Sequence, residues 1–533
     1  MALTIRQSPS DYALAYNPQV YVASSDYADL AKYELLIELY KNNVLQDSIT
    51  LNKLPLPTGY VVFDIQSIVE GYLKSDFGVT QAFETNDNSF VNVKASLRDY
   101  GTISGWGAYV EHNYYAWNGV AETIDWNSFT QANYSNTTYF LTRSDITQST
   151  TTTENAELYL ISSSLGATRG ADLIVNGSFD TDTVWSHVVQ WKIDLLNSNV
   201  AVCDATFANV SYSMFQAVTG VIANNYYQCT ITVDSISQGA YISLLFGTTT
   251  FIITEPGTHS LIGLAPVNNE IFYIRFIGGA IGDTCQVSFA EAKAFDVKPY
   301  SLEVKSYTSS NTLIGTKTIK NDKIGSEDKY KFLRVPAGKY NLNQVNNTLL
   351  LTGSQPLIES NCSYYTLRIK GQTGTYYATK TFNVDDSCGK YTKYRLHWLN
   401  RLGGYDSYTF DLVSRNNIDI EKKTFKKQLG GLTIQNSGEA SFSYQNSDRQ
   451  DSQYYTKFKN RTLITSDWLS NVESDWLSEL MTSPSVFWER GSEDFVAINI
   501  NATTYEIKNN KVDKIFNHTL EFSLSFDEFT QTL

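Results

Sequence analysis

The length, composition and charge of the chain exclude several classes of protein. Its 533 residues are too many for one hydrophobic core, and a hydrophobic content of 42% is enough to give each of several domains its own core. The 55 acidic residues outnumber the 41 basic ones, which argues against sequence-independent binding of duplex nucleic acid. We therefore expect several globular domains without specificity for nucleic acid.

The composition favours an all-β fold. The chain contains 36 Tyr and 27 Phe but only 3 Met. Aromatic residues are enriched in strands, where one face of the ring is buried while a tyrosine hydroxyl stays in water. We therefore expect a mainly all-β protein of several β-sandwiches, with one or two short helices.

The cysteines and the start of the chain give two further expectations. The five cysteines include no C-x-x-C pair, so we expect buried free thiols and neither a zinc site nor a disulfide framework. The sequence has no apolar stretch long enough for a membrane span, and its first residues lack the features of a signal peptide. We expect a soluble protein made in the cytoplasm. The cysteines are Cys203, Cys229, Cys285, Cys362 and Cys388.

The first region begins with a hairpin and a helix. In residues 32–51, apolar and polar residues alternate on both sides of a Lys-Asn-Asn sequence, which predicts a β-hairpin. Residues 61–73 change to a helical period, with Asp64 placed to cap a short helix.

The next elements are short. Residues 101–140 hold three tryptophans among Tyr, Asn and Gly, a pattern typical of short strands with exposed loops. The polar sequence 148–154 predicts an exposed loop, and residues 157–162 predict a strand. The three tryptophans are Trp106, Trp117 and Trp126.

A separate domain is predicted between residues 171 and 297. Lysine becomes scarce there, and apolar residues alternate in strand-like runs. The alternation seen at 157–162 resumes at 300–307, as though that strand had been interrupted. We therefore interpret the middle domain as an insertion. Its clearest predicted strands are residues 226–233, 240–246 and 270–277.

The last third of the chain alternates again. Residues 394–412 predict a hairpin, with a turn in which Gly403 and Gly404 allow positive φ. The basic run 422–427 (KKTFKK) is interpreted as a solvated strand edge, because lysine commonly protects such edges. Residues 467–481 place apolar side chains at helical spacing and predict a short helix.

No catalytic or metal-binding constellation is recognisable. The five histidines are scattered, and neither an HExxH nor a GxSxG motif is present. The carboxylate pairs at 385–386 and 493–494 lie in turn-like contexts, and adjacent strand residues point to opposite faces, unlike a glycosidase pair. We predict no catalytic residues, no metal site and no cofactor.

One segment resembles a known binding module. Residues 172–179 (DLIVNGSF), followed by two tryptophans and amphipathic strands, resemble the opening of the jelly-roll carbohydrate-binding modules. The resemblance implies a two-sheet sandwich over residues 171–297, an aromatic platform for sugar rings and a structural calcium, although Ser178 replaces the usual acidic residue. The alternative is that the aromatic residues belong to the core. The candidate glycan-binding residues are Trp185, Trp191, Tyr226 and Tyr227.

A second resemblance concerns the C-terminal part. Residues 382–388 (FNVDDSC) and 394–410 (YRLHWLNRLGGYDSYTF) resemble a segment of virion structural proteins of tailed bacteriophages that infect Bacteroidota, including the crAss-like group. The likeness extends to residues 475–487 (DWLSELMTSPSVF) and 16–23 (YNPQVYVA). It implies a component of the virion, in its tail or neck. Release by lysis would also reconcile an extracellular type of composition with the missing export signal.

The elements and resemblances together predict three regions. Residues 1–170 with 298–360 are expected to form an N-terminal β-sandwich assembly region, and residues 171–297 an inserted jelly-roll domain. Residues 361–533 are expected to form a C-terminal β domain that contains the short helix 467–481.

The predicted function is structural. We expect a non-enzymatic virion component, in a tail, neck or ring, that contacts copies of itself in a homo-oligomeric ring and other tail, neck or portal proteins. Two alternatives remain open: a receptor-binding tail protein whose jelly roll adheres to a host surface glycan, and a polysaccharide-degrading enzyme. The residues expected either to anchor the assembly interface or to hold the helix on its own sheet are Trp468, Leu469, Trp476 and Leu477.

Overall fold

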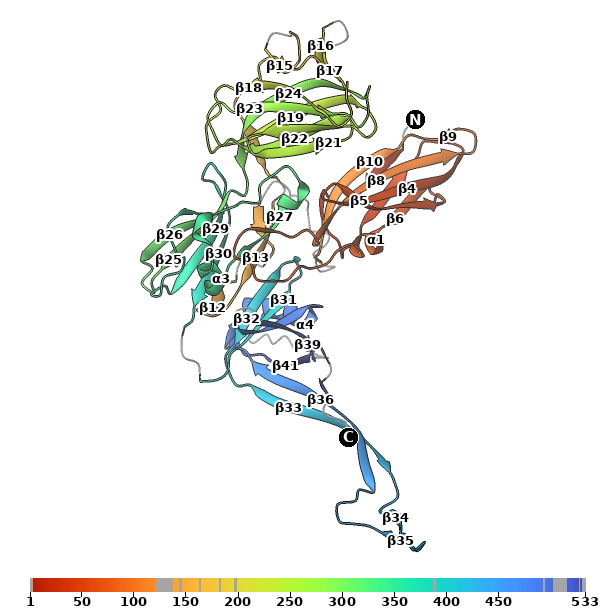
Figure 1. Cartoon of the computed structure of the whole chain (residues 1–533), viewed down its shortest axis with the longest axis vertical. Coiled ribbons are helices and arrows are strands. Elements are labelled where there is room, and N and C mark those ends of the chain that lie inside the picture. The colour runs from red at the N-terminus through yellow and green to blue at the C-terminus, as the bar shows by residue number, and fades with distance from the viewer. Residues whose placement is uncertain are drawn as a thin grey trace. The chain divides into compact units, whose positions relative to one another are not determined.

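The computed structural model describes residues 3–120, 138–142, 146–162, 164–181, 184–195, 199–386, 390–491, 494–501, 515–526 and 528–529. These residues form many strands and three short α-helices, which confirms the mainly all-β fold (Figure 1). Trp126 and Cys388 lie outside the described residues. No helix in the described part is both long and apolar enough to cross a membrane.

The chain divides into two compact units. Unit 1 comprises Met1–Leu141, Leu158–Pro336 and Leu342–Lys380. Unit 2 comprises Thr142–Glu157, Ala337–Asn341 and Thr381–Leu533. The unit boundaries follow contacts rather than chain order, because two short internal segments belong with the C-terminal strands.

The N-terminal part of unit 1 contains two sheets that share one hydrophobic core. One sheet has the order β1-β3-β6, and the other has the order β2-β10-β8-β4-β5, with β9 paired to β8. The strands are β1 (Thr4–Gln7), β2 (Tyr12–Leu14), β3 (Val20–Ser24), β4 (Leu30–Lys41), β5 (Val44–Lys53), β6 (Tyr60–Asp64), β8 (Phe90–Gly101), β9 (Gly105–Trp106) and β10 (Val110–Trp117).

The predicted hairpin is confirmed, and the predicted helix is shorter than expected. Strands β4 and β5 are joined through Asn42 and Asn43, whose φ angles of 49° and 63° suit a tight hairpin turn. The first part of the sequence 61–73 instead forms β6, because it pairs with β3. Helix α1 (Gln66–Glu70) follows, and the Asp64 carboxylate accepts a hydrogen bond from its first backbone N–H at 3.1 Å.

Unit 1 contains strands of two further sheets. One has the order β11-β13-β27-β7, and the other includes the order β30-β29-β25-β26-β28. Since β13 and β25 lie in different sheets, the strand at 300–307 does not continue the strand at 157–162, contrary to the sequence interpretation. The elements are β7 (Glu84–Thr85), β11 (Thr138–Phe140), β13 (Glu157–Ser162), β25 (Ser301–Tyr307), β26 (Leu313–Lys320), η2 (Asp328–Lys331), β27 (Phe332–Pro336), α3 (Lys339–Asn343), η3 (Asn347–Leu349), β28 (Leu350–Thr352), β29 (Tyr364–Lys370) and β30 (Tyr376–Val384).

The middle segment is a two-sheet sandwich. Its sheets have the orders β16-β17-β24-β19-β22 and β15-β18-β23-β20-β21, and their inward side chains form one core. The strands predicted at 226–233, 240–246 and 270–277 are present as β19, β20 and β23. The strands are β14 (Gly166–Arg169), β15 (Ser186–His187), β16 (Trp191–Asp194), β17 (Val200–Asp204), β18 (Ser211–Ala217), β19 (Tyr226–Ile236), β20 (Tyr241–Phe246), β21 (Thr249–Ile253), β22 (Gly257–Leu264), β23 (Ile271–Ile277) and β24 (Thr284–Val297).

The chain enters and leaves this sandwich side by side. Strand β14 pairs antiparallel with the end of β24, so Gly166 lies opposite Val297 and Arg169 lies opposite Ala294. Adjacent entry and exit points are what a tolerated domain insertion requires. A small cluster packs around this junction. It contains Tyr226, Ile262, Phe295 and Val297, with Leu165, Leu264, Tyr300 and Ile324 against it.

Replacing residues 170–293 by an Asn-Gly turn should leave the rest of the chain folded. Arg169 and Ala294 are directly paired, so a two-residue turn closes the ribbon, and the removed sandwich carries its own core. We expect the melting temperature of unit 2 to stay unchanged. The melting temperature of unit 1 should decrease modestly, because the junction cluster loses partners. Thermal unfolding followed by circular dichroism measures both. Aggregation of the shortened chain would show that the sandwich is part of the scaffold.

Unit 2 is built on a sheet with the order β32-β31-β38-β39-β41-β36-β33, with β42 paired to β36. Helix α4 packs its buried side chains into the core that this sheet provides. The elements are β12 (Gln148–Thr150), β31 (Tyr394–Leu399), β32 (Tyr405–Phe410), β33 (Arg415–Lys426), β34 (Gly431–Ile434), β35 (Ala440–Ser443), β36 (Asp451–Thr465), β37 (Leu469–Ser470), α4 (Asn471–Thr482), β38 (Val486–Gly491), β39 (Asp494–Ile500), β40 (Ile515–Phe516), β41 (Thr519–Leu524) and β42 (Glu528–Phe529).

Local chemistry explains where the elements of unit 2 begin. The predicted hairpin at 394–412 is present, and Gly403 adopts a φ of 89° in its turn, whereas Gly404 does not need positive φ. Helix α4 begins four residues later than predicted. The Ser470 hydroxyl accepts a hydrogen bond from the Glu473 backbone N–H, and the Glu473 carboxylate accepts one from the Ser470 N–H, which forms a capping box.

Candidate functional site

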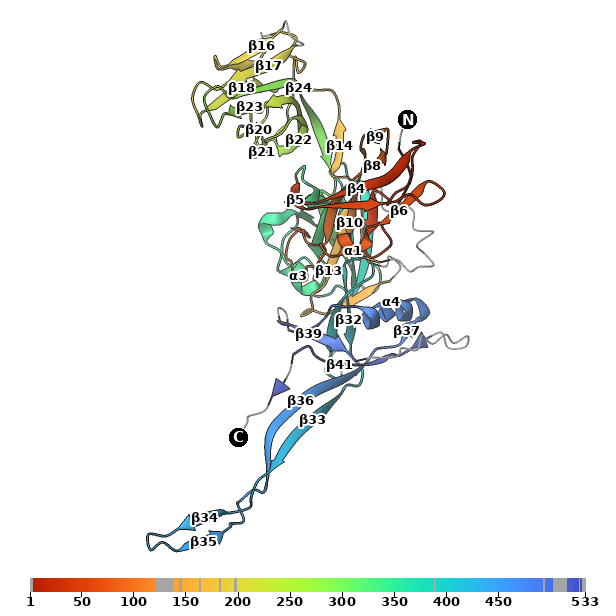
Figure 2. The same cartoon turned by 90° about the vertical axis from the view of Figure 1, so that its right-hand side faces the viewer.

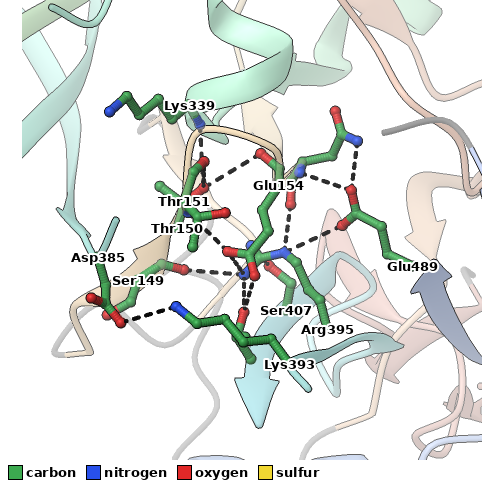
Figure 3. Close-up of polar contacts among 12 residues, drawn as sticks. Ser149, Thr150, Thr151, Glu154, Lys339, Asp385, Lys393, Arg395, Ser407 and Glu489 are labelled. Carbon is green, nitrogen blue, oxygen red and sulfur yellow. Dashed lines mark hydrogen bonds and ion pairs between the residues drawn. The ribbon is translucent and has the colours of Figure 1, made fainter. Parts of the chain in front are cut away.

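A buried charge cluster lies at the base of unit 2. Strand β31 places Arg395 and His397 on the same face, because side chains two residues apart point in one direction. Arg395 lies opposite Glu489 of β38 in the strand register. Glu154 comes from the segment that follows β12. These four residues form the Arg395 cluster, of which Figure 3 shows Arg395, Glu154 and Glu489.

The Arg395 guanidinium is only 2% exposed and uses all its nitrogens. Its Nε lies 3.4 Å from Glu489 Oε2, and its Nη1 lies 3.3 Å from Glu154 Oε2. Nε also donates to the Asn155 carbonyl at 2.8 Å, and Nη2 donates to Ser407 Oγ at 2.7 Å. A buried arginine with this many partners fixes the positions of every strand that it touches.

The two carboxylates are satisfied as well. Glu154 accepts hydrogen bonds from the Thr151 backbone N–H and the Thr409 hydroxyl, both at 2.8 Å. Glu489 accepts from both the backbone and the side-chain nitrogen of Asn155, at 3.1 and 2.7 Å. The segment around β12 is therefore attached to the sheet of unit 2 by polar contacts on both sides.

The interpretation of residues 148–154 as an exposed loop holds for Ser149, Thr152 and Thr153 but is wrong for the residues that this attachment buries. Gln148, Thr150 and Glu154 are buried, and β12 pairs in parallel with residues 382–384 of β30. The segment is polar because its partners are charged and polar. Polarity without apolar alternation is the usual pattern of a loop, and the sequence therefore predicted one.

The Arg395 cluster has a structural role. The Arg395, Glu154 and Glu489 side chains are at most 9% exposed, so a substrate has no access to them. The predicted carboxylate pair at 385–386 is divided between two lysines. Asp385 lies 3.5 Å from Lys393 Nζ (Figure 3), and Asp386 lies 2.6 Å from Lys339 Nζ. Glu493 lies outside the described residues.

The stability of unit 2 should decrease as the pH falls from about 7 to about 5. Burial lowers the pKa of His397 below its ordinary value of 6.5, against the opposing effect of Glu489, whose Oε2 lies 2.8 Å from Nε2. The unfolded chain therefore takes up this proton first, and stability is lost below the ordinary pKa. Chemical denaturation at several pH values should show this dependence. The His397→Gln variant should show less of it, and an identical profile for the variant would contradict the assignment.

Unit 2 also carries a long hairpin, which we call the arm (residues 415–465) and which is exposed over most of its length. Strands β33 and β36 form an antiparallel ribbon that continues past the other strands of the sheet, and β34 and β35 form its tip (Figure 2). Every residue of β33, β34 and β35 is exposed. Residues 422–426 of the basic run lie on β33, at the sheet edge, as predicted, and Lys427 follows the strand.

The tip of the arm is amphipathic. Leu432 lies opposite Phe442 and Ile434 lies opposite Ala440, so these side chains share one face. The facing positions on the other side are Gly431 with Ser443 and Thr433 with Ser441. Leu432, Ile434 and Phe442 are 64%, 67% and 51% exposed. Such alternation normally accompanies a buried face, yet the described residues of this chain leave the apolar side uncovered.

The arm differs in charge from the rest of the chain. Its residues include nine Lys and Arg against five Asp and Glu, for a net charge of +4. The rest of the chain has 32 basic and 50 acidic residues, for a net charge of -18. The arm is therefore attracted to acidic surfaces of the kind that the rest of this chain provides.

The four predicted interface residues have two different environments. Leu469, Trp476 and Leu477 belong to the core of unit 2, where they hold α4 on its sheet. Trp476 Nε1 donates to Asp406 Oδ2 at 2.8 Å, and its ring centroid lies 5.0 Å from that of Trp398. Trp468 is instead 59% exposed. Of the four, only Trp468 is available for contact with another chain.

The four predicted glycan-binding residues are all buried, so none of them forms an exposed platform in this structure. Trp185, Trp191 and Tyr227 form part of the sandwich core, and Tyr226 packs in the junction cluster. Both indole nitrogens donate to backbone carbonyls, Trp185 to Asn176 and Trp191 to Tyr212, at 3.0 Å. The rings fill the space between the two sheets, which is the alternative that the sequence left open.

The described residues contain no group of three or more His, Cys, Asp or Glu side chains that could hold a metal ion. Cys203, Cys229 and Cys285 are free thiols, and these three and Cys362 are buried, as predicted for these positions. Burial raises the pKa of Cys203 to about 12, so its thiol stays protonated at neutral pH.

Sequence reasoning missed both main features of unit 2. The Arg395 cluster joins residues more than two hundred positions apart, and no local pattern reports such a contact. The arm has a local signal, because apolar and Ser/Thr residues alternate on both sides of a turn at residues 435–438.

No protein-family model matches the chain, and no curated protein matches it either. Among solved structures, the enzymatically active domain of tailspike protein 4 from bacteriophage CBA120 is similar over 23% of this chain and 21% of that chain. The sequence identity is 13% and the TM-score is 0.18. The matched part covers about a fifth of that structure, and the similarity is too low to assign a function.

Proposed function

We propose that this chain is a structural component of a bacteriophage virion, in its tail, neck or ring. It acts through self-assembly and contacts with other virion proteins, among them tail, neck or portal proteins, and not through catalysis. The observation that carries the proposal is the arm, an exposed ribbon whose tip presents an apolar face to solvent. A surface of this kind is typical of proteins that bury it against another chain.

The construction of unit 2 supports this role. Of the segments that resemble phage virion proteins, residues 394–410 form the hairpin β31–β32, and residues 475–487 form most of helix α4 and the start of β38. These elements carry the Arg395 cluster and the Trp476 core, which make a rigid base for the sheet that includes the arm. An arm that binds another chain is positioned more precisely when it extends from a rigid sheet.

The alternative of a receptor-binding or glycan-adhering tail protein has less support. Its four candidate aromatic residues lie in the core, so a sugar ring cannot stack on them without opening the sandwich. The polysaccharide-degrading alternative also has less support, because Asp385 and Asp386 each form an ion pair with a different lysine.

Quantitative mass spectrometry of purified particles tests the proposal. In particles of the phage that encodes the chain, purified on density gradients and washed with salt, the chain should remain at a constant copy number relative to the main shell protein. The purified chain should neither degrade host capsule nor bind a glycan array. Loss of the chain on washing, or turnover of capsule, would contradict the structural role.

A further inference from the structure

We propose that the arm of one copy docks its apolar tip on a patch at the start of helix α4 of a second copy of this chain. The α4 patch comprises Asp467, Trp468, Val472 and Asp475. The inference rests on the proposed function, because it names the partner and the two surfaces of the assembly contact.

The tip has an exposed apolar face that a partner could cover. A two-stranded hairpin is only marginally stable in water, and this one has exposed Leu432, Ile434 and Phe442 on one face. Tyr444, which follows the end of β35, is also apolar in its ring and is 64% exposed. A flat apolar side of this kind packs against another apolar surface of similar size.

The α4 patch offers a matching surface. Trp468 and Val472 are 59% and 54% exposed and lie four residues apart, on either side of the helix cap at Ser470. Asp467 and Asp475 flank them and are exposed. A large exposed tryptophan next to an aliphatic side chain is the kind of anchor that dominates protein interfaces.

Charge indicates that the partner is another copy of the chain. The arm has a net charge of +4, with Lys426 and Lys427 immediately before the tip. Residues 466–533, which contain the α4 patch, have twelve acidic and four basic residues. The arm of one copy and the C-terminal segment of another therefore attract each other, while two arms repel.

The contact is between molecules and not within one. The tip and the α4 patch belong to the same unit, yet the apolar side chains of both are exposed in the single chain. Because the two surfaces differ, each copy uses its arm on one neighbour and its patch on the other. Such a head-to-tail contact produces rings where the rotation closes and filaments where it does not.

Mixing two defective variants tests this contact directly. The tip variant is Leu432→Ser with Phe442→Ser, the patch variant is Trp468→Ser with Val472→Ser, and the control is Ile103→Ser, an apolar residue 91% exposed in unit 1. Masses are measured by sedimentation velocity at low ionic strength. The wild-type chain and the control should form oligomers, and each defective variant alone should associate at least tenfold more weakly.

An equal mixture of the tip and patch variants should form a one-to-one dimer and nothing larger, because one intact tip can meet one intact patch. A mixture that stays monomeric while the wild type assembles, or a wild-type chain that stays monomeric, would overturn the inference. The copy number of the chain in particles is measured in a separate experiment. A constant copy number together with no association of the purified chain would show that the chain is a virion component but uses a different contact.

Folding of the variants is checked by thermal unfolding. All four side chains substituted in the tip and patch variants are exposed. The melting temperature of each variant should therefore match that of the wild type. A third variant, Lys426→Glu with Lys427→Glu, keeps the apolar face intact and should also weaken association, most strongly at low salt. Association that does not change in this variant would contradict the electrostatic part of the contact.

Discussion

Replacing Arg395 by methionine should lower the free energy of unfolding of unit 2 by about 3 to 5 kcal/mol. The substitution keeps most of the side-chain volume but leaves Glu154 and Glu489 as buried carboxylates without their cation. It also removes the donors to the Asn155 and Ser149 carbonyls, so the segment around β12 loses its attachment. Chemical denaturation followed by tryptophan fluorescence measures the loss.

Arg490 supplies a matched control for this prediction. It forms an ion pair with Asp494 at 2.8 Å, but its side chain is 51% exposed. An exposed pair contributes about 0 to 1 kcal/mol, so Arg490→Met should change stability little. Equal losses in the two variants would show that the Arg395 cluster does not hold unit 2 together.

Replacing Trp476 by alanine should cost about 3 to 5 kcal/mol, the usual range for a large aromatic side chain removed from a core. The change opens a cavity beside Trp398 and leaves Asp406 Oδ2 without the indole donor. Asp406 would then rely on the donors at its other oxygen, the Thr142 hydroxyl and the Gln148 amide. The unfolding transition of unit 2 reports the change.

The control for this prediction is Trp468, which lies eight residues earlier and is 59% exposed. Trp468→Ala should change the free energy of unfolding by less than about 0.5 kcal/mol, because exposed substitutions away from special features have small effects. If Trp468→Ala proved as destabilising as Trp476→Ala, the division between core and interface residues at α4 would be wrong.

Local patterns were sufficient to predict elements with a clear period or turn. The hairpin 32–51 combined alternation with two asparagines that tolerate positive φ, and the strands at 226–233 and 270–277 carried an apolar residue at every second position. Residues 61–64 were assigned to a helix because a short apolar run suits both structures, and pairing with β3 decides between them.

Features that depend on distant contacts were not predictable. The segment 148–154 resembles a loop by composition, and only its contact with Arg395 explains its burial. Likewise, the sequence around Trp185 and Trp191 suits a surface platform as well as a core, and the packing of two sheets decides between them. The exposure of Trp468 depends on where the capping box starts α4.

Antibody labelling of intact particles is the most direct test of the central claim, that the chain is a structural part of a virion. Electron micrographs of particles of the encoding phage, labelled with an antibody to this chain, should show label at one fixed position on the tail, neck or ring of most particles. Particles that carry no label before or after mild disruption, with the chain found only in the soluble lysate, would contradict the account.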